Sequence, residues 1–163
     1  MKYIVRVIFS LVLVFSFVSC DDSTSDCRED MGVELGASFF QSIYNPQKQL
    51  FETKEYSPRI WIKGIKNDSV LCDSLTKKTI FLPLHISKNE TGYIFDNITS
   101  KLIDTLIVSH TQTEKLVSLE CGCKMQYTIE SYRVTTHGID SVIVKDPTVN
   151  GNTDIQLQVF FKK

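Results

Sequence analysis

Residues 155–161 read Ile155-Gln156-Leu157-Gln158-Val159-Phe160-Phe161, and this stretch decides the fold class. Its odd positions are all apolar, and its even positions are mostly polar. Because the side chains of a strand point alternately to opposite faces, a sustained period of two predicts a half-buried β-strand.

The same alternation recurs along much of the chain, and no segment has the period of an amphipathic helix. The longest case is Leu116–Glu130, where Gly122 predicts a bulge or bend. Pro83 cannot donate to a sheet ladder, so the strand that contains it is expected at a sheet edge or at a bulge. The other expected strands are Val33–Tyr44, Arg59–Ile65, Thr79–Ile86, Thr91–Asp96, Lys101–His110 and Ile139–Lys145.

Turn-forming residues, such as those of Asn45-Pro46 and Asp146-Pro147, separate these segments at intervals of about ten residues. About eight short strands spaced in this way predict one all-β domain over residues 33–163. The expected architecture is an antiparallel β-sandwich, immunoglobulin-like or related. A small β-barrel is the alternative arrangement.

The N-terminus has the pattern of a secretory signal peptide. Lys2 and Arg6 flank the start of an apolar run, Val7–Val18, which is shorter than the ~20 residues that a membrane-spanning helix needs. Residues 17–20 (FVSC) resemble a lipobox, whose cysteine sulfur receives diacylglycerol. We therefore predict a leader over residues 1–19 and a lipid on Cys20 that anchors the chain to a membrane. The alternative is ordinary cleavage, with Cys20 left as a thiol or disulfide partner.

An acidic segment, residues 20–32, is expected to tether the domain to this anchor. Asp21, Asp22 and Asp26 lie among serine and threonine, a composition too poor in apolar side chains to fold alone. The segment resembles the acidic tag that exports some lipoproteins to the outer leaflet of the outer membrane. We expect a position on the outer membrane that faces either the periplasm or the cell surface.

Composition and motifs favour neither a nucleic-acid partner nor catalysis. The formal net charge of −1 comes without the basic stripe that nucleic-acid binding requires. His85, His110 and His137 are scattered and show no metal-ligand spacing, and no phosphate loop or nucleophile motif is present. We expect no catalytic residue, no metal site and no cofactor.

The C-terminal half resembles a known family. The resemblance is carried by residues 117–122 (VSLECG), by residues 138–142 (GIDSV), and by a tail with Pro147, Val149, Asn150 and Ile155. These look like a Bacteroidota family of small lipoproteins that carry a domain of unknown function. The resemblance implies a lipid anchor, an all-β domain and a cell-envelope location, and it implies no catalytic residue. Cys123 departs from the pattern of the family.

Four cysteines remain beside the anchor: Cys27, Cys72, Cys121 and Cys123. An even number in an exported chain predicts two disulfides. Cys121 and Cys123 are two residues apart on one strand, roughly 7 Å, so each is expected to bond to a distant cysteine. The options are Cys27–Cys121 with Cys72–Cys123, or the swapped pairing. A redox-active pair and a zinc site are weaker alternatives, because neither a helix N-terminus nor a suitably spaced histidine supports them.

Five of the eleven aspartates directly precede serine or threonine. This pattern resembles the O-glycan acceptor motif of Bacteroidota secreted proteins. The candidate acceptors are Ser69, Ser74, Thr105 and Ser141, with Ser69 and Ser74 expected on a loop. Asp-Ser pairs are also common in turns, which is the structural alternative.

Together these features predict a lipid-anchored, non-catalytic protein of the cell envelope. The leading hypothesis is a structural or protein-interaction module whose partner is another envelope protein. The alternative is a module that binds a glycan or small ligand through exposed aromatic side chains such as Trp61 or Tyr93. Since Trp61 lies between two isoleucines, we expect it in the core rather than on a ligand-binding surface.

Overall fold

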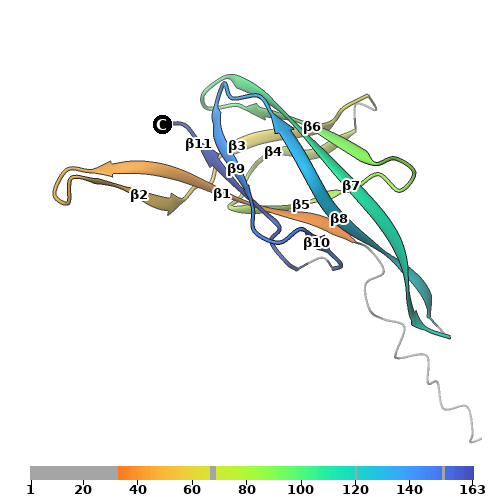
Figure 1. Ribbon diagram of the computed structural model, residues 1–163. Coiled ribbons are helices and arrows are strands. Elements are labelled where there is room, and N and C mark those ends of the chain that lie inside the picture. The colour runs from red at the N-terminus through yellow and green to blue at the C-terminus, as the bar shows by residue number, and fades with distance from the viewer. Residues whose placement is uncertain (1–32, 67–68, 120, 152) are drawn as a thin grey trace, which may run out of the picture.

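The computed structural model describes residues 33–66, 69–119, 121–151 and 153–163. Within these ranges the chain forms eleven strands in two curled sheets, as Figure 1 shows. The strands are β1 (Glu34–Asn45), β2 (Leu50–Glu55), β3 (Arg59–Gly64), β4 (Val70–Thr76), β5 (Thr79–Pro83), β6 (Glu90–Asn97), β7 (Leu102–Ser118), β8 (Gly122–Val134), β9 (Ile139–Val144), β10 (Thr148–Val149) and β11 (Leu157–Phe161). The expected all-β, sandwich-like fold is confirmed, with more strands than the eight predicted.

β1 is the centre of the first sheet, whose order is β2-β1-β11-β9. β11 lies parallel to β1, with Ala37 opposite Leu157, so the expectation of a wholly antiparallel sandwich was wrong for this pair. On the other side of β1, β5 pairs antiparallel with its first half and β2 with its second half. A Cβ on Gly36 would lie 2.0 Å from the backbone oxygen of Asp154, so glycine is required at this approach.

The second sheet has the order β10-β8-β7-β6-β3-β4, and all its pairs are antiparallel. The core lies between the two sheets. Leu157, Val159 and Phe161 are buried, as the alternation in residues 155–161 predicts. The ring of Phe39 joins the sheets, because its centroid lies 5.6 Å from that of Phe161 in the first sheet and 6.4 Å from that of Phe95 in the second.

The predicted strand Leu116–Glu130 is in fact two strands and a turn. β7 ends at Ser118 and β8 begins at Gly122, whose φ of 75° suits glycine. Both arms of a hairpin keep the period of two, so the sequence pattern passes through the reversal without revealing it. β2, β4 and β10 were not predicted, because β2 is largely exposed, β4 bulges out of its register with β3, and β10 is only two residues long.

Two details refine the expected faces. Pro83 ends β5, and β5 pairs only with β1, so the predicted edge position is confirmed. Gln156, at a position expected to be polar and outward, is fully buried, and its Oε1 accepts a 2.8 Å hydrogen bond from the N–H of Gly36.

Among the described residues there is no helix of the length and apolar character needed to cross a bilayer.

Candidate functional site

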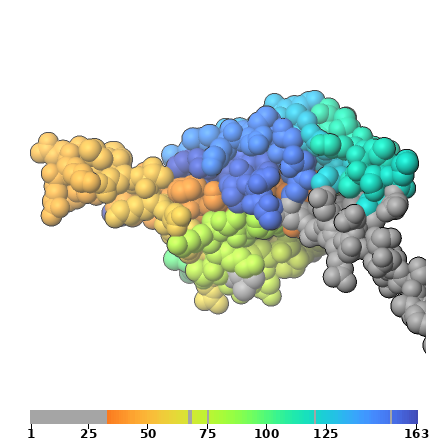
Figure 2. Space-filling model, turned by 90° about the horizontal axis from the view of Figure 1, so that it is seen from below, coloured from red at the N-terminus to blue at the C-terminus, as the bar shows by residue number. Residues whose placement is uncertain are grey.

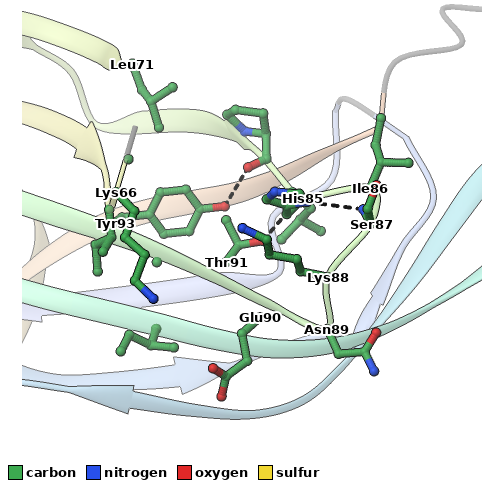
Figure 3. A pocket seen from close by; sticks show the side chains of 16 residues that line it. Lys66, Leu71, His85, Ile86, Ser87, Lys88, Asn89, Glu90, Thr91 and Tyr93 are labelled. Carbon is green, nitrogen blue, oxygen red and sulfur yellow. Dashed lines mark hydrogen bonds between the residues drawn. The ribbon is translucent and has the colours of Figure 1, made fainter. Parts of the chain in front are cut away.

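An open pocket of about 730 Å³ lies between the β3–β4 turn, the β5–β6 connection and β6 (Figure 3). Its floor is apolar and is made by Ile65, Leu71, Leu84, Ile107 and the ring of Tyr93. Its rim is polar and includes Lys66, His85, Ser87, Lys88, Asn89 and Glu90. Such a pocket fits a small ligand with an apolar body and a polar end.

The charge of the rim is positive. The Glu90 carboxylate already binds Arg133 at 3.0 Å, so its charge is compensated. Lys66 and Lys88 come from opposite sides of the pocket (Figure 3), and neither forms an ion pair among the described residues. The rim therefore favours an anionic group on the ligand.

Thr91 connects the pocket to the core. Its hydroxyl oxygen accepts a hydrogen bond from the backbone N–H of His85 at 2.8 Å and lies 2.8 Å from Nε2 of His110. His110 is 1 % exposed and packs edge-on against Tyr127. Its Nδ1 has no hydrogen-bond partner among the residues that the structure describes.

Burial lowers the pKa of His110 below its usual value, and the nearby His85 adds to this effect while Glu130 opposes it. His110 is therefore neutral at pH 7, which suits a core position. Its alternation with Leu106 and Val108 along β7 is the sequence signal that could have placed it inside.

Tyr93 and Trp61, the two aromatic residues considered as ligand contacts, differ in burial from what the sequence predicts. Tyr93 is buried, its hydroxyl donates to the Pro83 carbonyl at 2.8 Å, and burial raises its pKa. Trp61 is only half-buried, on the outer face of the second sheet, because Ile60 and Ile62 take the core face on either side of it. The expectation that Trp61 is a core residue was therefore wrong, as was the expectation that Tyr93 is exposed.

Sequence reasoning missed the role of Asp104, a buried carboxylate at the start of β7. Its oxygens accept hydrogen bonds from the backbone N–H groups of His137, Gly138 and Ile139 at 2.7–2.8 Å, and from the Thr135 hydroxyl at 2.9 Å. These donors all lie in or next to the β8–β9 connection, so Asp104 holds that connection in place. Each of its two carboxylate oxygens accepts two of these hydrogen bonds, which indicates a structural role.

The β1–β2 hairpin projects from the body of the molecule as an arm, visible as the orange and yellow extension in Figure 2. We define the β1–β2 arm as residues 42–53. It exposes Tyr44 (48 %), Leu50 (46 %) and Phe51 (72 %), and the rings of Tyr44 and Phe51 lie 5.4 Å apart. A Lys48–Glu52 ion pair at 2.8 Å borders them and lowers the pKa of Glu52. Nothing in the sequence pattern distinguished this arm from an ordinary hairpin.

The cysteines do not form the two disulfides that were predicted among them. Cys72 and Cys123 are free thiols, whereas Cys121 is disulfide-bonded. Cys72 is buried in β4, where its Sγ lies 3.9 Å from the carbonyl oxygen of Ile60, and Cys123 is exposed in β8. Both predicted pairings joined Cys72 to Cys121 or Cys123, and the free, buried thiol of Cys72 contradicts both. Cys27 lies outside the described residues.

The four candidate O-glycan acceptors differ in accessibility. Ser69 and Ser141 are exposed, whereas Thr105 is half-buried near the start of β7. Ser74 is half-buried within β4, at a φ of 45° where that strand bulges, so the expectation that it lies on a loop was wrong. Glycosylation of these residues stays a prediction.

Other sequence expectations fall outside the described part of the chain. These are the leader over residues 1–19, the lipid on Cys20 and the tether over residues 20–32. Among the described residues, no three His, Cys, Asp or Glu side chains gather as metal ligands would.

Comparison with known proteins places the chain in a family. Residues 59–161, more than half of the chain, match the model described as "Family of unknown function (DUF6452)". The chain belongs to the DUF6452 family. The DUF6452 match begins at β3 and ends in β11, so it includes the pocket and Asp104 but not the β1–β2 arm. No curated protein and no solved structure matches the chain.

Proposed function

We propose that the protein is a non-catalytic component of a Bacteroidota-type outer membrane, held there by lipid on Cys20, and that its β1–β2 arm binds another envelope protein. The anchor is supported by the signal-peptide pattern and by the lipobox-like residues 17–20. The observation that carries the binding role is the exposed aromatic pair of Tyr44 and Phe51.

The β1–β2 arm receives little support from the rest of its sheet. A two-stranded hairpin alone is marginally stable in water. From Ser42 onward, β1 pairs with β2 on one side and with no described strand on the other. The arm therefore offers a free strand edge beside an apolar patch, and both features favour the docking of a partner chain.

The arm test uses a photo-crosslinking phenylalanine analogue in place of Phe51 in native cells. We expect a discrete cross-linked product from this position, because exposed aromatic side chains dominate binding energy at interfaces. Phe51→Ala is expected to weaken binding to the captured partner by about 30-fold, or about 2 kcal/mol.

The matched control carries the analogue in place of Ile143, which is 50 % exposed on β9 and remote from the arm in the sheet order. Equal cross-linking from both positions would argue against a specific role of the arm. Unchanged affinity of Phe51→Ala for the captured protein would do the same.

A second candidate function is binding of a small amphiphile with an anionic group. It is favoured by the apolar floor of the pocket together with Lys66 and Lys88 on its rim. We propose an amphiphile and not a glycan as the ligand, because Tyr93 is buried and Trp61 does not line the pocket.

Anilinonaphthalene sulfonate, which has an apolar body and a sulfonate, is a suitable probe of this pocket. Ile86 lines the pocket and is 65 % exposed, so Ile86→Asp keeps the core intact while placing a negative charge in the site. We expect the Kd of the probe, followed by fluorescence titration, to rise about tenfold, or about 1.4 kcal/mol. Ile143→Asp is the control, and an equal effect of both substitutions would exclude the pocket as the binding site.

A further inference from the structure

The β7–β8 hairpin extends beyond the second sheet at the end opposite to the β1–β2 arm (Figure 1). β6 pairs with β7 only as far as Ser109, and β10 pairs with β8 only at Tyr127 and Thr128. Among the described strands, the part of the hairpin beyond these pairs is therefore a two-stranded ribbon. We define the β7–β8 tip as residues 115–119 and 121–124. Its apolar side chains are uncovered, since Leu116 is 59 % and Leu119 is 95 % exposed.

The disulfide of Cys121 is a second, independent observation at this tip. Cys121 is bonded, while Cys72 and Cys123 are free, so its partner lies outside the described residues. On the proposed anchor the sulfur of Cys20 is in a thioether, so the sequence leaves Cys27 as the expected partner of Cys121. Closing this bond removes two electrons and two protons from two thiols, and a thiol–disulfide exchange protein of the envelope accepts them as its own disulfide becomes a dithiol.

The length of chain between Cys20 and Cys27 then fixes which end of the molecule lies near the lipid. Seven residues span at most about 25 Å. β7 alone, with its 17 residues, is about 56 Å long at ~3.3 Å per residue. With the expected Cys27–Cys121 bond, a lipid on Cys20 would stay near the β7–β8 tip and would not reach the β1–β2 arm.

We propose that the β7–β8 tip is a second membrane contact, in which Leu116 and Leu119 enter the boundary between the headgroups and acyl chains of a phospholipid bilayer. This inference rests on the proposed lipid anchor. Transfer of the two leucine side chains out of water has a favourable free energy. The hairpin backbone stays in the hydrated headgroup layer, where its free edges keep hydrogen-bond partners. The same orientation directs the β1–β2 arm away from the membrane.

Cys123 supplies a natural reporter for the test. It is free and exposed, and it pairs directly across the hairpin with Leu116, so the two side chains share a face. The full-length lipidated protein is labelled on Cys123 with a nitrobenzoxadiazole fluorophore and reconstituted into phosphatidylcholine vesicles with and without spin-labelled acyl chains. We expect a blue shift of the emission and a loss of intensity in the spin-labelled vesicles.

Two variants sharpen the result. Leu116→Ser with Leu119→Ser changes only exposed side chains and is expected to return the Cys123 emission to that of a label in water. In a Cys123→Ser background, the label on Phe51→Cys at the arm is expected to show neither shift nor quenching. A blue shift that persists in the double leucine variant would overturn the proposal that Leu116 and Leu119 enter the bilayer.

The outcomes separate the inference from the proposed anchor. Protein that floats with the vesicles while its Cys123 label stays water-like overturns the tip contact and leaves the anchor intact. Protein that does not float, and whose intact mass shows no lipid, overturns both. Peptide mapping without reduction is expected to find Cys27 joined to Cys121, and any other partner of Cys121 contradicts the geometry.

Discussion

Replacing Phe39 by alanine is expected to lower the free energy of unfolding by about 4 kcal/mol, in the range of large-to-small core substitutions. Phe39 is fully buried, and its ring contacts Phe161 in its own sheet and Phe95 in the facing sheet. Removing the ring leaves a cavity where the two sheets meet, and the surrounding strands cannot collapse to fill it because their backbones are held by ladder hydrogen bonds.

The measurement is urea unfolding followed by circular dichroism, with the m value compared between variants. Phe51→Ala is the matched control, because Phe51 is 72 % exposed on the arm, and we expect it to change stability by at most about 0.5 kcal/mol. Phe39→Leu, expected to cost about 1.5 kcal/mol, provides a reading if the alanine variant does not fold. Similar losses in Phe39→Ala and Phe51→Ala would show that Phe39 does not join the sheets.

The second large effect is expected at Asp104. Asp104→Asn keeps the shape of the side chain but turns one acceptor oxygen into a donor that faces backbone N–H groups. We expect a loss of about 3 kcal/mol, because buried donors are left unsatisfied and a charge-assisted network is lost. Asp140→Asn, at an exposed position on β9, is the control and is expected to be nearly neutral.

The effect of Asp104→Asn should depend on pH. Burial acts to raise the pKa of Asp104, but the backbone N–H groups of residues 137–139 and the hydroxyl of Thr135 together hold it below its usual value. A carboxyl whose pKa is lower in the folded than in the unfolded state stabilises the fold above the unfolded value, about 3.9. That stabilisation is lost as the pH falls through the folded value.

The stability difference between wild type and Asp104→Asn should therefore be largest near pH 7 and should narrow below about pH 4. Urea midpoints measured at several pH values from 7 down to about 3 would follow this change. A difference that stays constant across this range would mean that the charge of Asp104 is not what holds the β8–β9 connection.

Several features of this fold could be predicted because they are local. The alternation of Leu157, Val159 and Phe161 places a strand and names its buried face without knowledge of its neighbours. Pro83 predicts an edge because a missing N–H is a property of that residue alone. The alternation of side chains, applied strictly to β3 and β7, would have placed Trp61 outside and His110 inside.

Other features could not be predicted, because they depend on which segments meet. The reversal at Gly122 is hidden, since a hairpin keeps its period through the turn. The thiol of Cys72 is free because β4 carries it into the core, and cysteine counting contains no information about that position. The pocket brings together Lys66 and Lys88 from two separate connections, and no motif links them in the sequence.

The sequence by itself determined the all-β class, the buried face of most strands and the signal-peptide pattern at the N-terminus. Only the tertiary structure decided the parallel pairing of β1 with β11, the role of Asp104 and the two hairpins that project at opposite ends. The physical reason is the range of each effect. Side-chain alternation is set by neighbouring residues along one strand, whereas the pairing of β1 with β11 is set by packing between segments more than a hundred residues apart.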